Sequence, residues 1–306
     1  MDSLLYWIEQ VFNGLSQGSI YALIVIGYTL IVGIVGLPSF AYGDIVMCGA
    51  YFAYLVFSSA GNNALLVFLL SFLGSAILGI VMHKLCYEPF FNSPRHISLM
   101  CTIAMSILIK NVVQLITKSV TVNIPSLFGE NYFQVGNFRI TVTQICVMLI
   151  VILMSIAFTL FLRKTKMGIQ LRAVSQDRQA AALMGIDVNF VTMIGNAIGC
   201  GMGGIAGLLY AVYYNSFRAT MGGPIGMKAF SAAVLGGLGD ISISSICGVI
   251  IGVLENIGIA LTGTGYRDMV AFIFLIAVLM LKPSGLVSKK RGLLPEKRKE
   301  IKKNAG

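Results

Sequence analysis

The stretch VTQICVMLIVILMSIAFTLFL, residues 142–162, decides the fold class of this protein. It is apolar almost throughout, and at about 1.5 Å rise per residue a helix of this length crosses the roughly 30 Å hydrocarbon core of a bilayer. Residues 64–82 and 246–261 form comparable runs. A lipid-facing backbone must satisfy its own hydrogen bonds, and apolarity that is continuous rather than alternating excludes a barrel. The sequence therefore predicts an all-α, polytopic membrane protein.

The composition of the whole chain agrees with that class. Hydrophobic residues make up 57% of the 306 residues and charged residues 11%, whereas soluble domains carry roughly 25% charged residues. The six cysteines are dispersed without a CxxC pair and predict neither a metal site nor a disulfide framework. No basic residue precedes the first apolar run, so no cleavable signal peptide is expected.

Nine apolar windows predict the membrane helices, at residues 13–35, 42–59, 63–83, 97–116, 140–162, 190–213, 227–239, 243–262 and 267–282. The second and the seventh are short and rich in glycine. We therefore expect a transmembrane helix bundle of eight or nine spans, including one or two short or broken helices.

Basic residues set the orientation of these spans. They concentrate in the loop 163–187 and the tail 289–306, and the positive-inside rule places both in the cytoplasm. Counting back, the N-terminus is external if all windows cross, and internal if 42–59 is re-entrant. We expect a membrane domain at 1–288 and a basic cytoplasmic tail at 289–306. The net charge of +10 then reflects contact with anionic lipid headgroups rather than with nucleic acid.

A ridge of glycines is the first candidate for a functional surface. In the sixth window, small residues recur every fourth position along one helix face and allow another helix to approach closely. Such a face either packs within the bundle or lines a translocation path, and glycines of the two short windows are candidates for the same roles. These residues are Gly195, Gly199, Gly203 and Gly207, with Gly43, Gly236 and Gly237.

Acidic residues inside apolar windows are costly and usually face protein or water. Asp44 and Asp240 each follow a glycine at the edge of a short window, where a helix cap and a functional contact are equally compatible with the pattern. Glu255 lies deeper. A proton-coupled carrier would pair it with a titratable group, but the histidines, His83 and His96, both fall in a predicted cytoplasmic loop.

The residues for enzymatic chemistry are missing from the sequence. No His, Cys and carboxylate cluster has metal-ligand spacing, and two loop histidines do not provide a Ser-His-Asp set. No GxxxxGK[ST] phosphate loop occurs in the chain. We therefore expect no catalytic activity, bound cofactor or metal, and any ATP is consumed by a partner.

The loop 163–187 is too long for a tight connection and too regular for a linker. Leu171, Val174, Ala181 and Met184 predict the apolar face of a short amphipathic helix, which Gly185 ends. Such a helix either lies on the membrane surface or docks a cytoplasmic motor, its small side chains fitting a partner groove.

Residues 168–188, GIQLRAVSQDRQAAALMGIDV, resemble the cytoplasmic coupling loop of branched-chain amino-acid ABC permeases. NGLSQGSIYAL at 13–23, GMKAF at 226–230, AVLGGLG at 233–239 and KPSGL at 282–286 are similar to that family in the same order. The chain departs from it at Ser39-Phe40-Ala41-Tyr42-Gly43-Asp44, where the family commonly has Asn-Phe-Ala-His-Gly-Glu. The length is similar to that of the shorter of the family's two membrane subunits.

The resemblance implies a permease that imports leucine, isoleucine and valine across the inner membrane of a bacterium. It implies a second permease subunit, two cytoplasmic ATPases that hold ATP and magnesium, and an external solute-binding protein. It also implies contact with the ATPases through residues of the loop, namely Gly168, Arg172, Ala173, Asp177, Ala181 and Gly185. A permease for urea, amides or another small solute, and a stand-alone secondary carrier, remain as alternatives.

Overall fold

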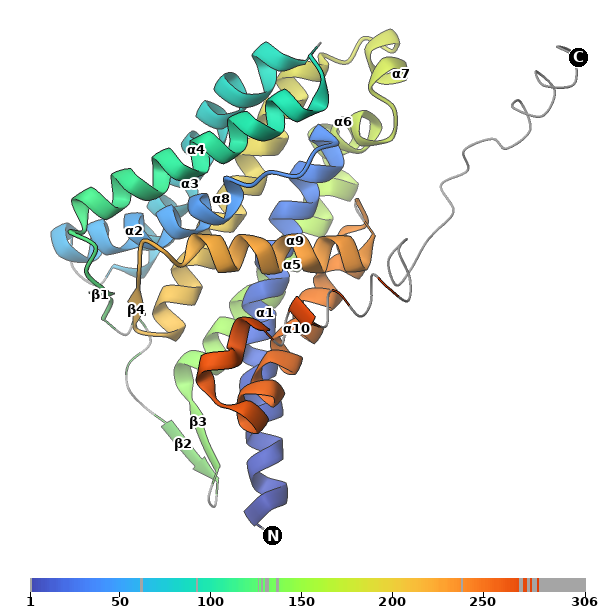
Figure 1. Ribbon diagram of the computed structural model, residues 1–306. Helices are drawn as coiled ribbons and strands as arrows, with labels where there is room; N and C mark the ends of the chain where they lie inside the picture. Colours follow the sequence, from blue (N-terminus) through green and yellow to red (C-terminus); the bar gives the residue numbers. More distant parts are fainter. Residues whose placement is uncertain are drawn as a thin grey trace, which may run out of the picture.

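The structure, a computed structural model, describes residues 2–60, 63–91, 93–125, 127, 129, 132–135, 138–237, 239–269, 272–273, 276 and 280. In this part of the chain, α-helices form a bundle, and short antiparallel strand pairs lie beside it (Figure 1). The all-α class is thus confirmed for the described residues. The predicted tail at 289–306 and the motif at 282–286 lie outside them.

The helices follow the predicted windows. The α-helices are α1 (Asp2–Val35), α2 (Tyr42–Ala60), α3 (Ala64–Met82), α4 (Arg95–Ile116), α5 (Val142–Lys164), α6 (Lys166–Gln176), α7 (Arg178–Leu183), α8 (Val188–Tyr213), α9 (Gly222–Gly236) and α10 (Ile241–Thr262). A π-turn η1 (His83–Tyr87) and the 3-10 turns η2 (Glu88–Phe90) and η3 (Thr264–Tyr266) complete them. The ninth window, 267–282, is described only in part.

Six of the described helices are long and apolar enough to cross a membrane, namely α1, α3, α4, α5, α8 and α10. The two windows predicted to be short form α2, with 19 residues, and α9, with 15 residues. A 15-residue helix spans about 22 Å, which is less than the hydrocarbon core. The chain is therefore a multi-pass membrane protein that contains short as well as full-length helices.

Side-chain caps fix where several helices begin. Asp187 accepts a hydrogen bond from the backbone of Phe190 and starts α8, and Asp240 accepts one from Ile243 and starts α10. A capping box between Thr141 and Gln144 starts α5. The helix-cap interpretation of Asp240 is thus confirmed.

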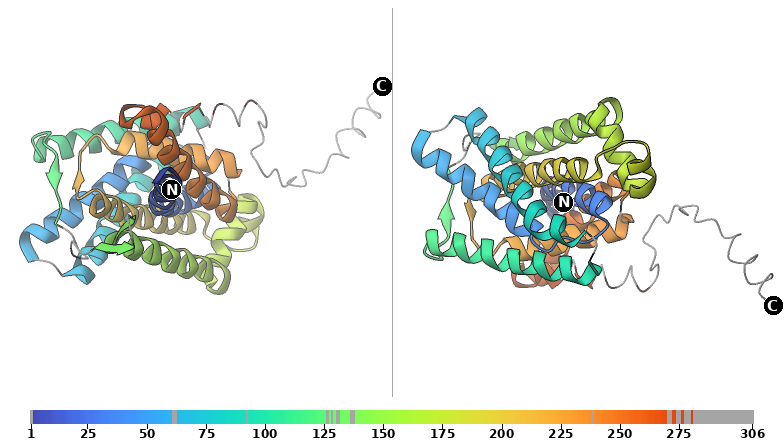
Figure 2. Two further views of the ribbon diagram at one scale, coloured as in Figure 1. Left: turned by 90° about the horizontal axis from the view of Figure 1, so that it is seen from below. Right: turned by 90° about the horizontal axis from the view of Figure 1, so that it is seen from above.

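Helices α1 and α8 form the centre of the bundle. In their most apolar stretches 94% and 83% of the residues are buried, against 17% in α4. The N-terminal end of α1 lies near the centre when the bundle is viewed along its length (Figure 2). The outer helices α3, α4 and α5 expose large apolar side chains such as Leu69, Ile107 and Leu153, and so face lipid or a partner subunit.

Glycines allow the central helices to touch along their backbones. A Cβ atom on Gly18 of α1 would lie 2.9 Å from the Cα atom of Val249 in α10, and Gly252 of α10 faces Gly18 in turn. The helix α8 meets α1 and α2 in the same manner through its glycine ridge. The close helix approach that the four-residue spacing predicts is therefore present.

Strands were not predicted from the sequence, and the structure contains two short strand pairs. Strand β1 (Val122–Asn123) pairs with β4 (Ser216–Phe217), and β2 (Tyr132–Val135) pairs with β3 (Phe138–Thr141), both antiparallel. The β2–β3 hairpin lies at the same end of the bundle as the N-terminus, and α6 and α7 lie at the opposite end (Figure 1). The two ends are therefore built differently.

Candidate functional site

The loop 163–187 folds into two helices joined at Asp177. The Asp177 side chain accepts hydrogen bonds from the backbone N–H groups of Gln179 and Ala180 at 2.9 and 3.0 Å and so starts α7. Gly185 has a φ of +82°, the left-handed conformation that ends a helix. The predicted helix and its stop are confirmed, but the loop holds a pair of helices rather than one.

The apolar face of this loop points into the protein. Leu171 is 1% exposed, Val174 2% and Ala181 4%. The expected contact of Ala181 with a partner groove is therefore wrong in this structure, because its methyl group packs against the chain's own bundle. Leu183 and Met184 instead point outward, at 89% and 83% exposure.

Three contacts hold the loop in place, and two of them reach the core helices. Leu171 fills the notch at Gly195 of α8, where its Cδ2 atom lies 2.7 Å from the position of an added Cβ atom. The Arg178 guanidinium donates to the carbonyl oxygen of Ile34, in the last turn of α1, and lies 5.2 Å from the ring centroid of Phe91. A cation at the C-terminal end of a helix also interacts favourably with the helix dipole. The loop is thus attached to α1 and α8.

The other predicted coupling residues take different positions in the loop. Gly168 is buried where α6 crosses the end of α5, and a Cβ atom there would meet the backbone of Leu162 at 2.6 Å. Arg172 is exposed and Ala173 is half-buried. Of the six predicted coupling residues, Arg172, Gly185 and the helix cap Asp177 are therefore exposed.

The glycine ridge of α8 is covered by two helices. Ile34 and Ile31 of α1 lie against Gly195 and Gly199, and the Tyr42 hydroxyl of α2 lies 2.8 Å from the position of an added Cβ atom on Gly203. Gly207 meets the backbone of Val46 in α2. The ridge accordingly packs against other helices of this chain. Packing within the bundle was one of the two roles that the sequence left open.

The two short helices meet at Gly43 and Asp44. Gly43 packs against the backbone of Gly222 and Gly226 in α9. The buried Asp44 accepts a hydrogen bond from Ser106 of α4 and is not a helix cap. In place of the histidine common in the resembling family, Tyr42 is buried and its hydroxyl donates to the carbonyl oxygen of Ile24 at 2.8 Å.

The other pair of candidate glycines shapes the turn after α9. A Cβ atom on Gly236 would meet Ser244 of α10, and Gly237 has a φ of +87°. Both glycines therefore serve the sharp reversal between α9 and α10.

Glu255 of α10 does have charged partners, contrary to the sequence-based interpretation. Its Oε1 atom accepts from the Lys228 ammonium of α9 at 3.0 Å and from the Arg267 guanidinium that follows η3. Lys228 also pairs with Asp268 at 2.7 Å. The side chains of Glu255 and Lys228 are 0% and 5% exposed, so the central pair of this cluster is buried.

Two tyrosines complete the cluster. The Tyr21 hydroxyl of α1 donates to Glu255 at 3.4 Å and accepts from Lys228 at 3.3 Å. Tyr214, just beyond α8, accepts a hydrogen bond from Arg267. Burial raises the pKa of Tyr214 well above its ordinary value of 10.0, so this phenol stays neutral. The cluster therefore joins α1, α8, α9 and α10.

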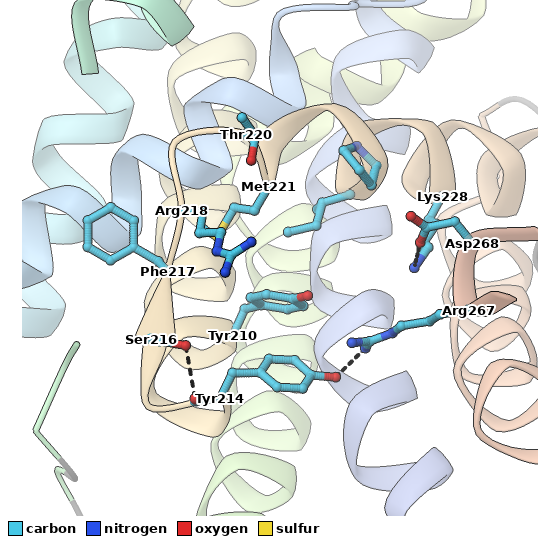
Figure 3. A pocket seen from close by; sticks show the side chains of 12 residues that line it. Tyr210, Tyr214, Ser216, Phe217, Arg218, Thr220, Met221, Lys228, Arg267 and Asp268 are labelled. Carbon is cyan, nitrogen blue, oxygen red and sulfur yellow. Dashed lines mark hydrogen bonds and ion pairs between the residues drawn. The ribbon is translucent and has the colours of Figure 1, made fainter. Parts of the chain in front are cut away.

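A cavity of about 430 Å³ opens beside these charges. Lys228, Arg267 and Asp268 lie on one side of it, and Met221 and Arg218 lie on the other (Figure 3). The sequence offered one signal for it, because Lys228 lies inside the apolar window 227–239, but basic residues served in the sequence analysis only to set the orientation of the helices.

Comparison with known proteins decides the family. The model of the family described as branched-chain amino acid transport system / permease component matches residues 10–279. The chain belongs to this permease family. No solved structure is significantly similar to it.

Individual relatives agree with that membership. The permease is 36% identical over 301 residues to the high-affinity branched-chain amino acid transport system permease protein LivH of Salmonella typhimurium, covering 94% of this chain and 97% of the relative. It is 33% identical to BraD of Pseudomonas aeruginosa, covering 94% and 98%. The ribose import permease RbsC of Escherichia coli is 29% identical, covering 90% and 86%.

Membership in this family fixes the type of protein. The permease is a transport subunit and not a catalytic one, and it is one component of a multi-subunit system. The resemblance drawn from the coupling loop is thereby confirmed.

Proposed function

We propose that this permease imports leucine, isoleucine and valine as one membrane subunit of an ATP-driven transporter. The relatives named for branched-chain amino acid transport support this solute class, and they match nearly the whole chain. The attachment of the exposed α7 to the central helices α1 and α8 carries the ATP-driven part of the proposal.

We infer the partner subunits from the family, and from the sequence, which has no phosphate loop of its own. Two cytoplasmic ATPases hold ATP and magnesium, a second permease subunit completes the pore, and an external binding protein delivers the solute. Large apolar side chains on α3, α4 and α5 leave surface for lipid and for that second permease.

Coupling proceeds through the loop 163–187. Closure of the ATPases pushes on α7, where Leu183 and Met184 form an exposed apolar contact surface. Because Leu171 and Arg178 connect the loop to α8 and α1, the displacement reaches the two central helices directly. The bundle then alternates between outward-open and inward-open states.

The membrane topology completes the proposal, with nine crossings, an external N-terminus and a cytoplasmic C-terminus, or with eight crossings and both termini in the cytoplasm. The β2–β3 hairpin and the N-terminus lie at the opposite end of the bundle from the basic loop 163–187, which supports the external N-terminus (Figure 1). Nine crossings require α2, α9 and the segment 267–282 to cross beside the six long helices.

Cysteine labelling in intact cells is expected to reveal this orientation. A thiol reagent that cannot cross the membrane modifies Val120→Cys, a position 62% exposed after α4, without permeabilisation. The same reagent reaches Gln176→Cys, exposed at the end of α6, only after permeabilisation. The unaltered chain, with its six native cysteines, provides the background. The reverse pattern contradicts the proposed topology.

Competition for uptake tests the solute class. In proteoliposomes that contain the complete transporter, unlabelled isoleucine and valine are expected to suppress uptake of labelled leucine, while urea and ribose do not. Preferred uptake of urea, an amide or ribose would reject the proposed solute.

A further inference from the structure

The cavity beside Lys228 has both charged and apolar lining. Lys228, Arg267 and Asp268 lie at one side, and Met221 lies at the other beside Arg218 (Figure 3). Its volume of about 430 Å³ falls within the roughly 300–1,000 Å³ typical of sites for small molecules. The cavity therefore offers ionic partners and apolar surface, including Met221 and Pro224, to a small molecule with a charged head and an apolar tail.

Two cations and two carboxylates at this site contact one another, and Arg218 adds a further positive charge to the cavity lining. Lys228 and Arg267 share the Oε1 atom of Glu255, and Asp268 pairs with Lys228. The Oε2 atom of Glu255 is buried without a hydrogen-bond partner among the described residues. A zwitterion can pair with the cations and with Asp268 at once, whereas a lone carboxylate leaves Asp268 without a new partner and a lone amine adds a further positive charge. Uncharged solutes cannot replace any of the ionic partners.

We propose that this cavity binds the zwitterionic head of an aliphatic α-amino acid during transport. The carboxylate lies at Arg267 and Lys228, the ammonium group at Asp268, and the aliphatic side chain against Met221 and Pro224. The inference rests on the proposed function, because it takes an amino acid to be the solute.

The individual side chains suit these roles. A guanidinium binds a carboxylate with planar, charge-assisted hydrogen bonds, and the contacts of Arg267 with Glu255 and Tyr214 involve its Nε and Nη2 atoms. Asp268 is 49% exposed on its side chain, so it can turn from Lys228 to an incoming ammonium group. Lys228 keeps Glu255 as a partner when Asp268 turns.

Protection of an introduced cysteine tests the site on the purified transporter complex in lipid nanodiscs. Thr220 is exposed and lines the cavity, so Thr220→Cys reports its occupancy. Leucine at about ten times its Kd is expected to slow thiol modification about tenfold, because only empty cavities react. 4-Methylpentanoate lacks the ammonium group and 3-methylbutylamine lacks the carboxylate, and at the same concentration each slows modification less than about twofold.

Two matched variants complete the test. Gln176→Cys lies far along the chain in the coupling loop, and leucine is expected to leave its modification rate unchanged. Adding Asp268→Asn to Thr220→Cys is expected to abolish protection by leucine. Protection that persists in this double variant, or equal protection by 3-methylbutylamine, overturns the assignment of the head group.

Uptake by the same complex separates failure of the site from failure of the function. Leucine uptake without protection at position 220 rejects this cavity and leaves the proposed function intact. Uptake of ribose or urea in place of leucine rejects both.

Discussion

Leu183→Asp is expected to abolish ATP-driven uptake while the helical bundle still folds. Leu183 is 89% exposed at the end of α7, so the substitution removes no contact within the chain. In the assembled transporter the aspartate brings an unpaired charge into an apolar contact with an ATPase. Loss of a central interface residue costs about 2 kcal/mol or more, roughly a thirtyfold loss of affinity. Co-purification of the ATPases and stimulated ATP hydrolysis measure the effect.

The control variant is Gln176→Asp, which places the same charge at an exposed polar position of the same loop. It is expected to retain the ATPases and near-normal uptake. If Leu183→Asp retains both as well, α7 does not dock the motor and is a helix that lies on the membrane surface. Ala181→Asp is a poor substitute for this test, because Ala181 is buried and the variant would disturb the bundle itself.

Glu255→Leu is expected to destabilise the permease severely. The substitution leaves the ammonium of Lys228 and the guanidinium of Arg267 without their shared carboxylate in a buried position. Removing one partner from a buried ion pair costs about 3–5 kcal/mol. We expect little folded protein in the membrane and early aggregation in size-exclusion chromatography after detergent extraction at increasing temperatures.

Two further variants serve as controls for this result. Glu255→Gln keeps an acceptor oxygen near Lys228 and Arg267, so a smaller loss of stability is expected. Glu88→Gln removes an exposed carboxylate that accepts a hydrogen bond from Asn189, and it is expected to have little effect on stability. A Glu255→Leu protein as stable as the unaltered chain contradicts a structural role for the cluster.

The sequence predicted which segments form helices better than it predicted which residues contact one another. Continuous apolar runs such as 142–162 indicate a membrane helix whatever surrounds it, and those windows became helices. The β2–β3 hairpin was missed because strands of four residues at the membrane edge have no periodicity of their own.

Pairing between distant residues was the part that the sequence did not reveal. The amphipathic pattern of the coupling loop showed that Ala181 lies on an apolar face, but not that this face packs on the chain's own core. Glu255 and Lys228 lie 27 positions apart on different helices, so no helical spacing links them. Histidines were considered as partners for Glu255, whereas a lysine and an arginine fill that role.

Uptake of labelled leucine into proteoliposomes tests the central claim most directly. The vesicles contain this permease, its partner permease and the ATPases, and the external binding protein is added with leucine outside. We predict accumulation of leucine above the external concentration that requires ATP at the ATPases and persists when proton and sodium gradients are collapsed. Accumulation that needs an ion gradient and proceeds without ATP would contradict the claim and identify a secondary carrier.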